Sequence, residues 1–497
     1  MLNLSSSDSP GRARPRRRRG AWLSVVAVAG ALALGVPTAN AAVVRAAGPQ
    51  QAGSAARPAA AQATPAQTTK QYVIRFWPRW INFAQQKGIT KAHGADTFIG
   101  PEQPMSPLYN TVNAINDDTL YASAFVDTTL GPAIMTIPAT PVTYSLLPLT
   151  VFGVRIPTNI KPQTPGTYAL VPPGWRGKLP RGVTKVTDPY PMSLWIIRTD
   201  KYSSTGANMI PQATAFRAAL HMTTLAQYKA DHAAGPAKIV PIVPSFFFSF
   251  KLAEDLAVTL TPNVFLRTMQ RAVADPSTEP MHASDLQLSR AFNQAFAAAQ
   301  RAARHGNPIP LLRIDTAARA AYRAIDTNYR THYVPQTKWV HFTNIADWGT
   351  AYLDRASTTE YCQYCNDEAA AGYYDAFVDG AGRTLNGARH SYTLTFPAAD
   401  IPQAQRFWSL TAYVPRRIEL VPNPAKKYVV ASYTPGLVKN PDGSITIYMA
   451  PTRPAGAPMA NWLPVPRRDF SVLLRIYGPT GNTANPGYAP PAIARTR

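Results

Sequence analysis

Short apolar and aromatic runs alternate with strong turn signals over residues 407–477, and this pattern limits the fold more than any other feature of the sequence. An Asn-Pro-Asp-Gly sequence within it is typical of a type I turn followed by a glycine in the left-handed conformation. Residues 444–449 and 470–477 alternate apolar and polar side chains, as half-buried strands do. In the second of these strands, Arg475 and Tyr477 fall on the face opposite the apolar one. We therefore predict a compact antiparallel β-domain here.

The chain as a whole is predicted to be mainly β with a helical insert. Residues 70–205 hold several short strands at near-regular spacing, which is typical of a β-sandwich. Residues 206–345 have helical periodicity, and residues 346–497 contain the strands of a second, jelly-roll-like sandwich. A helix over residues 72–86, at the start of the first region, is predicted to break or bend near Pro78. The predicted fold class is thus α+β and multidomain.

The first 41 residues have the three parts of a secretory signal peptide in order. Residues 16–19 are all arginine, residues 21–36 are apolar, and residues 39–41 are Ala-Asn-Ala, which suits cleavage. An uncleaved anchor is the alternative, but the apolar segment is short and rich in Ala and Gly. We predict a secreted or extracytoplasmic protein whose mature chain has no transmembrane span, exported by the general or the twin-arginine route. Residues 42–69, rich in Ala, Pro and Gln, are predicted to be a flexible linker.

The chain is strongly basic, with a formal net charge of +23. The predicted signal peptide accounts for six arginines and one aspartate of this total, so the mature chain keeps a charge of +18. Such a charge favours anionic partners, among them an anionic cell-envelope polymer or lipid headgroups. A basic, solvated surface explains the same charge without a partner. Because neither a recognition helix nor an aromatic-basic motif occurs, specific nucleic-acid binding is not predicted. The sequence leaves the oligomeric state open.

Several short motifs are similar to those of two bacterial families. Four motifs resemble the domain of unknown function 1254 and lie at residues 116–121, 131–132, 173–175 and 197–199. Five motifs resemble its partner, the domain of unknown function 1214, and lie at residues 407–411, 421–424, 442–444, 461–464 and 475–477. The resemblance implies a sandwich, a helical insert and a jelly-roll-like sandwich, and it implies no agreed activity. Residues 143–149 depart from the first family, which usually has an Arg-Tyr pair and then an Asp and a Tyr in this strand. A pocket that those residues line in relatives would be altered or lost.

Cys362 and Cys365 are the only two cysteines. In an exported chain without a second C-x-x-C sequence, a local disulfide that closes a tight loop is favoured over redox chemistry or half of a zinc site. The loop is short, so the disulfide is expected to stabilise the fold little, and we place no chemistry there. The eight histidines form no cluster with the spacing of a zinc site. No metal and no cofactor is therefore predicted.

The sequence contains no nucleophile elbow, phosphate-binding glycine loop, dinucleotide-binding fingerprint or zincin helix, so no catalytic residue is assigned. Asp117 and Asp118 are adjacent and would point to opposite faces of a strand, so they cannot form an acid/base pair. Either could act singly in a pocket, whereas an Asn-Asp-Asp sequence before a strand is more often turn chemistry.

Aromatic rings, amides and a guanidinium group suit a binding site for sugars or small polar ligands. The ligand-binding candidates are Asn116, Asp117, Asp118, Tyr121, Trp408, Tyr413, Asn423, Asn461, Trp462, Arg475 and Tyr477. A polar and aromatic core between domains would use the same residues.

Two functional hypotheses follow from these features. In the first, the protein binds a polar or anionic envelope ligand, such as a glycan, a lipid headgroup or a small molecule, at a cleft between its domains. In the second, it is an extracytoplasmic hydrolase or lyase with a single carboxylate, Tyr or Arg site in that cleft.

Overall fold

The structure is a computed structural model that describes residues 63–101, 105–110, 112–150, 153–231, 239–242 and 250–496. The predicted signal peptide and residues 42–62 of the predicted linker lie outside these residues, and the rest of the linker leads into and begins helix α2 (Pro65–His93). After one N-terminal helix, β-sheets form in the first and last regions of the described chain and most of the helices lie between them, which confirms the predicted fold class. Within the described part of the chain, no helix combines the length and the apolar character needed to cross a membrane.

The first β-sandwich consists of two sheets whose inner faces enclose one core. One sheet has the order β4-β7-β2-β1-β9, with β1 Ile99–Gly100, β2 Thr119–Asp127, β4 Tyr144–Leu149, β7 Met192–Asp200 and β9 Val240–Pro241. The other has the order β6-β5-β3-β8, with β3 Ala133–Ile137, β5 Gly166–Val171, β6 Val183–Thr187 and β8 His221–Thr224. The short helices are η1 Thr128–Leu130, α3 Ile210–Ala219 and α4 Leu225–Asp231. Because β8 and β9 complete these sheets, the first sandwich continues well past the boundary predicted at residue 206.

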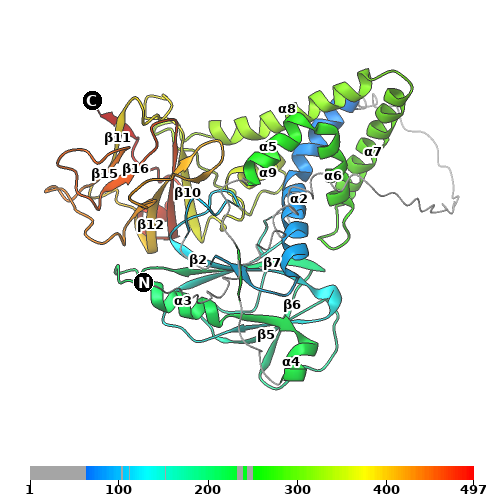
Figure 1. Ribbon diagram of the computed structural model, residues 1–497, viewed down its shortest axis with the longest axis horizontal. Helices are drawn as coiled ribbons and strands as arrows, with labels where there is room; N and C mark the ends of the chain where they lie inside the picture. The colour runs from blue at the N-terminus through cyan, green and yellow to red at the C-terminus, as the bar shows by residue number, and fades with distance from the viewer. Residues whose placement is uncertain are drawn as a thin grey trace, which may run out of the picture. The chain divides into compact units, whose positions relative to one another are not determined.

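The helical region is built around one apolar core. Its helices are α2 Pro65–His93, α5 Phe250–Leu260, α6 Pro262–Ala274, α7 Ala283–Arg304, α8 Ile309–Thr331 and α9 Tyr352–Tyr361. Figure 1 shows α2, in blue, among the green helices from the middle of the chain, and α2 contacts α6, α7, α8 and α9. Two boundaries thus differ from the prediction, because α2 packs with the helical region rather than with the first sandwich, and α9 lies beyond residue 345.

Helix α2 starts earlier than predicted because a capping box holds its first turn. The backbone N–H of Gln67 donates to the Thr64 hydroxyl over 3.3 Å, and the Thr64 N–H donates to the Gln67 side chain over 2.8 Å. The helix then continues through Pro78, so the break that was predicted there as an alternative to a bend does not occur. Trp77 and Ile81 on either side are fully buried, so packing outweighs the backbone hydrogen bond that proline removes.

The second β-sandwich encloses a core of its own, as predicted for the C-terminal region. One sheet has the order β10-β17-β12-β13 with β14 also on β12; the strands are β10 Ala371–Ala376, β12 Ala404–Val414, β13 Glu419–Leu420, β14 Val429–Ala431 and β17 Ser471–Pro479. The other has the order β16-β15-β11-β18, with β11 Ser391–Phe396, β15 Ile445–Ala450, β16 Trp462–Pro464 and β18 Ala494–Thr496; η2 is Gly481–Ala484. The predicted turn lies just before β15, where Gly443 has φ +81°.

Candidate ligand-binding cavity

The outward face of the first sandwich presents three cross-strand pairs from β2 and β7. Tyr121 pairs with Arg198, Ser123 with Ile196, and Phe125 with Leu194. Side chains alternate along a strand, and the intervening Ala122, Ala124, Trp195 and Ile197 fill the core of the sandwich. The three pairs therefore form a surface that is polar at one end and apolar at the other.

A sheet face of the second sandwich lies opposite this surface. On β17, Leu474 and Ile476 point into the sandwich core, and Arg475 and Tyr477 point away from it, as the alternation predicted. Arg475 lies next to Tyr373 on β10 and next to Ser409 on β12. Arg475 and Tyr477 are 2% and 1% exposed, so this outward face is buried against other parts of the chain.

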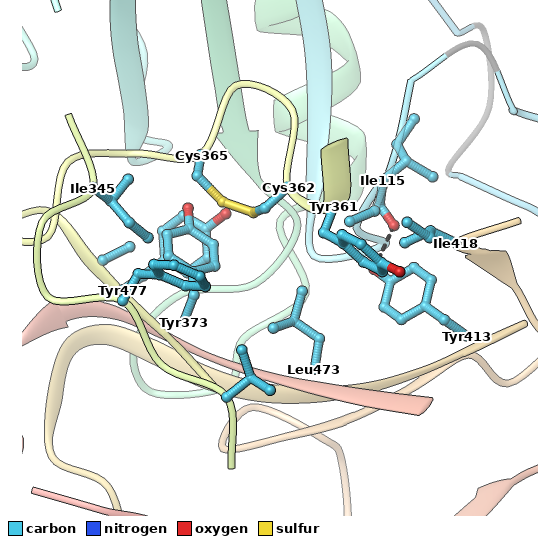
Figure 2. Packing of buried hydrophobic residues seen from close by; sticks show 14 of the residues in the cluster. Ile115, Ile345, Tyr361, Cys362, Cys365, Tyr373, Tyr413, Ile418, Leu473 and Tyr477 are labelled. Carbon is cyan, nitrogen blue, oxygen red and sulfur yellow. Dashed lines mark hydrogen bonds between the residues drawn. A yellow bond between two sulfur atoms is a disulfide. The ribbon is translucent and has the colours of Figure 1, made fainter. Parts of the chain in front are cut away.

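The segment just before β2 fastens the two sandwiches together. The Ser409 hydroxyl donates to the Asp118 carboxylate over 2.9 Å, and the Asn116 amide donates to the Tyr477 hydroxyl over 3.1 Å. The Tyr413 hydroxyl donates to the carbonyl oxygen of Ile115 over 2.7 Å, the contact drawn as a dashed line in Figure 2. Side chains of the second sandwich thus set the position of the turn that leads into β2.

Between these two faces lies a cavity of about 90 Å³. A buried water needs about 15 Å³ of such space, so there is room for roughly six waters or a ligand with a similar number of heavy atoms. Its described polar lining residues are Gln85, Tyr109, Asn113, Asn116, Tyr121, Ser123, Arg198, Gln363, Tyr364, Tyr373, Arg475 and Tyr477. Its apolar lining includes Ile89, Ile99, Met105, Val112, Phe125, Leu194, Ile196 and Ile242. Among the described lining residues there is no aspartate, glutamate or histidine.

Arg198 is the most unusual group in this cavity. Its side chain is buried, its terminal nitrogen donates to the carbonyl oxygen of Tyr364 over 2.6 Å, and its guanidinium carbon lies 5.3 Å from the centre of the Tyr121 ring. The Nε of Arg198 has no hydrogen-bond acceptor among the described residues. No described carboxylate forms an ion pair with the Arg198 guanidinium group. Burial alone would lower the pKa of Arg198, but the neighbouring tyrosines keep it above the ordinary value. The guanidinium group therefore stays charged, and part of its hydrogen-bonding capacity is unused.

Arg475, the second cation of the cavity, has several partners. One terminal nitrogen donates to the Ala114 carbonyl oxygen over 2.6 Å and to the Tyr413 hydroxyl over 2.8 Å. Burial raises the pKa of Asp375 to about 7, and the charge of Arg475 opposes this rise. Arg475 therefore has both structural hydrogen bonds and nearby acidic groups, whereas Arg198 has only part of its hydrogen bonding satisfied and no carboxylate partner. The two cations together give the cavity a positive potential.

The disulfide loop forms one wall of the cavity. Cys362 and Cys365 are joined by a disulfide, and the structure places it beside the rings of Tyr373 and Tyr477 (Figure 2). Tyr364 has φ +60°, an uncommon conformation for a residue other than glycine, and its carbonyl oxygen accepts from Arg198. No chemistry was predicted at this loop, yet all four of its residues line the cavity.

Four of the eleven predicted ligand-binding residues line the cavity, namely Asn116, Tyr121, Arg475 and Tyr477. Asp118 and Tyr413 hold the sandwiches together instead, and Asp117 pairs with Lys201 over 2.8 Å. The Asn116 side-chain oxygen accepts from the backbone N–H groups of Asp118 and Thr119, at 3.0 and 3.2 Å, so the Asn-Asp-Asp sequence is turn chemistry. Neither aspartate shares the cavity with Arg475.

The other four predicted residues have structural roles within the second sandwich. Trp408 packs in its core, and the Trp462 indole N–H donates to the Ala450 carbonyl oxygen over 2.9 Å. Asn423 bonds to the backbone of Lys427, and Asn461 donates to the carbonyl oxygens of Val438, before β15, and Thr446, within it. The side chains of these four residues serve the sandwich, through packing for Trp408 and through hydrogen bonds to the backbone for the others, so they belong to the fold rather than to the cavity.

Sequence reasoning missed Arg198, Tyr373 and Tyr364 as site residues. All nine residues of β7 are buried, so an arginine in this strand has to be accommodated inside the protein. An arginine within such a strand is therefore the signal that could have identified Arg198. Within the described residues, no group of three or more His, Cys, Asp and Glu side chains could hold a metal ion.

Two β-sandwiches and a helical region, with a cationic cavity between the sandwiches, define the architecture of this protein. Residues 95–224 match the family model described as "Protein of unknown function (DUF1254)", and residues 370–481 match the one described as "Protein of unknown function (DUF1214)". The two matches occur in the predicted order from the N- to the C-terminus, which confirms the predicted resemblance.

One solved structure supports the same fold, and a second shows only a weaker overall similarity. The crystal structure of the VPA0106 protein from Vibrio parahaemolyticus is 17% identical and covers 87% of this chain and 100% of its own, with a TM-score of 0.53. An uncharacterized protein from Burkholderia cenocepacia is 15% identical and covers 87% of this chain and 94% of its own, with a TM-score of 0.39. None of the curated proteins compared with the chain matches it significantly.

Proposed function

We propose that this protein is an extracytoplasmic binding protein for a small organic anion, with a carboxylate group and a short apolar part. The observation that carries the proposal is Arg198, a buried cation with an unused N–H group in a cavity whose described lining has no acidic side chain. A buried charge is costly unless it is paired, so a ligand carboxylate would supply the partner that the described residues do not. The predicted signal peptide supports a location outside the cytoplasm.

The shape of the cavity indicates how such a ligand would bind. Its carboxylate would lie between Arg198 and Arg475, with the hydroxyl groups of Tyr121, Tyr373 and Tyr477 as further hydrogen-bond donors. Its apolar part would extend along β2 and β7 toward Ile196, one pair further along the strands. Each pair advances by two residues, or about 7 Å, which suits the length of a ligand with about six heavy atoms. The cavity volume of about 90 Å³ favours a small molecule over a polymeric glycan.

The alternative of a hydrolase or lyase has less support. The described lining has tyrosines and arginines but no carboxylate or histidine, and Asp117 and Asp118 lie outside it. A general acid or base needs a pKa near the working pH, and burial raises the pKa of Tyr477 and Tyr413 above the ordinary tyrosine value. The cavity is therefore better suited to binding than to proton transfer.

The test is a comparison of charged ligands with their neutral counterparts. Propionate, butyrate and cyclopropanecarboxylate, which have five or six heavy atoms and so fit the cavity, would be titrated into the protein by calorimetry, beside the matching amides propionamide, butyramide and cyclopropanecarboxamide. We expect at least one carboxylate to bind about tenfold or more tightly than its amide, because a hydrogen-bonded charge pair contributes about 1.5–3 kcal/mol. Arg198→Met should abolish this preference, and Arg290→Met, an exposed arginine on α7, should not change it.

Two results would contradict the proposal. The first is equal affinity for carboxylates and amides, since the cavity charge would then play no part in recognition. The second is conversion of the bound carboxylate to a product, followed by nuclear magnetic resonance, that disappears in Arg198→Met. The second result would favour the enzyme hypothesis.

A further inference from the structure

A second cationic site lies on the surface of the C-terminal sandwich. It is an open groove of about 430 Å³, which we call the arginine groove, lined by Arg383, Thr384, Asn386, Arg389, His390, Asp469 and Arg495. It shares no described residue with the cavity between the sandwiches. The loop from Asp379 to His390, the turn before β17 and strand β18 meet here. Three arginines thus face one groove together with a single aspartate.

Backbone contacts hold the loop that carries two of these arginines. The N–H of Gly380 donates to the Ile493 carbonyl oxygen over 2.9 Å, and the N–H of Gly387 donates to the Arg468 carbonyl oxygen over 3.1 Å. A Cβ atom at Gly387 would lie only 2.3 Å from the carbonyl oxygen of Pro466, so this close approach requires glycine. The loop is therefore fixed at both ends before any ligand binds.

Most of the positive charge in the arginine groove is unpaired. Arg383 forms an ion pair with Asp379 over 2.9 Å, and the Asp469 carboxylate accepts a hydrogen bond of 2.6 Å from Asn386. Arg389 and Arg495 are exposed, and the described residues include no ion-pair partner for either of them. Desolvation lowers the pKa of His390, and the positive charges of Arg495, Arg383 and Arg389 lower it further. The three arginines therefore all lie close enough to His390 to affect it. Arg467 and Arg468 are also exposed, in the adjoining turn.

The composition of the groove distinguishes between kinds of anionic partner. Arginine binds phosphate through two parallel hydrogen bonds, and several arginines in one groove suit a chain of phosphates. A membrane-binding surface would add large apolar side chains, but none of the exposed large apolar residues lies in the groove. A surface for single-stranded nucleic acid would add aromatic rings for base stacking, and no Phe, Tyr or Trp is among the described lining residues.

We propose that the arginine groove binds a linear phosphate-rich polymer, such as the phosphodiester chain of a cell-envelope polymer. The groove would attach the protein to the polymer and leave the cavity between the sandwiches free for its small ligand. The net charge of the chain, +23 in total and +18 without the predicted signal peptide, would add long-range attraction to any such polyanion. This inference does not depend on the function proposed for the cavity.

The experiment measures binding of fluorescently labelled linear polyphosphate to the full mature chain at several sodium chloride concentrations. The test variant is Arg389→Glu/Arg495→Glu, and the matched control is Arg301→Glu/Arg304→Glu on α7, which changes the net charge equally at two exposed arginines. We expect the test variant to bind at least tenfold more weakly. The slope of log affinity against log salt concentration should fall by about two units, because each lost phosphate contact removes roughly one unit of slope. Arg389→Lys/Arg495→Lys should show an intermediate loss, since lysine keeps the charge without the paired hydrogen bonds.

Three outcomes would overturn the proposal. The first is absence of polyphosphate binding by the unaltered protein at 0.15 M salt. The second is an equal loss in the test variant and the α7 control, which would show that only the overall charge matters. The third is binding to vesicles of anionic phospholipid with no binding to polyphosphate, which would assign the groove to a membrane surface. Far-ultraviolet circular dichroism of each variant would establish that it is folded.

Discussion

Tyr121 and Arg198 are paired directly across β2 and β7, and the guanidinium carbon of Arg198 lies 5.3 Å from the centre of the Tyr121 ring. This contact places a cation against an aromatic face inside a cavity, where the attraction is less screened than in water. The tyrosine holds the guanidinium group in place and does not neutralise it. Arg198 is therefore both positioned and available, which is the arrangement expected of a ligand-binding residue.

We predict that the two cavity arginines differ in their contribution to stability. Replacement of Arg198 by methionine should change the free energy of unfolding by less than about 1 kcal/mol, because the desolvation energy that methionine avoids offsets the loss of the one hydrogen bond to the Tyr364 carbonyl. Arg475→Met should destabilise the protein by about 2–4 kcal/mol, because it leaves the Ala114 carbonyl and the Tyr413 hydroxyl without their donor. Urea unfolding followed by fluorescence would measure both values.

A clear contradiction would be equal destabilisation by the two substitutions. In that case Arg198 would serve the fold as Arg475 does, and its unused N–H group would not indicate a ligand. Arg290→Met on the surface of α7 provides the baseline for removal of an exposed arginine.

The contact between Asp118 and Tyr433 is predicted to couple the two sandwiches energetically. Asp118 is fully buried and accepts hydrogen bonds from the hydroxyl groups of Ser409 and Tyr433. Asp118→Ala should therefore destabilise by about 2–4 kcal/mol and Tyr433→Phe by about 1 kcal/mol. A double-mutant cycle should give a coupling energy of about 1 kcal/mol, nearly the whole effect of Tyr433→Phe, since each substitution removes the same bond. Additive effects of the two substitutions, measured by urea unfolding, would show that this bond contributes little.

The sequence allowed much of the fold to be predicted but only part of the cavity. Period-two alternation in residues 470–477 identified the strand and placed Arg475 and Tyr477 on its outward face. Arg198 could not be found in this way, because β7 is buried on both faces and so has no polar face to detect. Alternation describes one strand at a time, whereas the cavity depends on which strands of different domains face each other.

Composition was a poor guide where polar side chains bond to the backbone. Asn461 and Trp462 have the residue types of a sugar-binding site, yet their side chains bond to the backbone around β15. Asn423 closes its own loop in the same way. An amide that stabilises a turn cannot be distinguished by residue type from one that binds a ligand. The structure separates the two because it shows where each donor and acceptor is used.

Asp96 is predicted to make stability fall as the pH rises. Burial raises the pKa of Asp96 to about 7, although a hydrogen bond from the Asp127 N–H opposes this. The unfolded chain loses this proton near pH 4 and the folded protein near pH 7. Between these values the folded state binds more protons, so the free energy of unfolding decreases with increasing pH. Each pKa unit corresponds to about 1.4 kcal/mol, so the effect of this one group should reach a few kcal/mol.

The measurement is urea unfolding at pH values from 4 to 8, for the unaltered protein and for Asp96→Asn. Asparagine accepts the Asp127 hydrogen bond and tolerates the positive φ of +54° at this position, but it does not titrate. Its stability should fall less steeply with pH, although Asp375 and Glu368, whose pKa values burial also raises to about 7, will keep part of the slope. Identical pH profiles would show that Asp96 titrates normally in the folded protein.

Loss of the disulfide is predicted to weaken ligand binding as well as stability. The four-residue loop between Cys362 and Cys365 restricts the unfolded chain little, so Cys362→Ser/Cys365→Ser should cost about 2 kcal/mol on the chain-entropy estimate. The same change releases the loop whose Tyr364 carbonyl oxygen accepts from Arg198 over 2.6 Å. Affinity for the carboxylate probes should therefore fall by about tenfold, the equivalent of one lost hydrogen bond to a charged group.

Tyr364→Phe keeps both the disulfide and the carbonyl and should retain the affinity. Calorimetry of the two variants would show whether the loop or the phenol hydroxyl matters. Unchanged affinity in the serine variant would mean that Arg198 is held by Tyr121 alone.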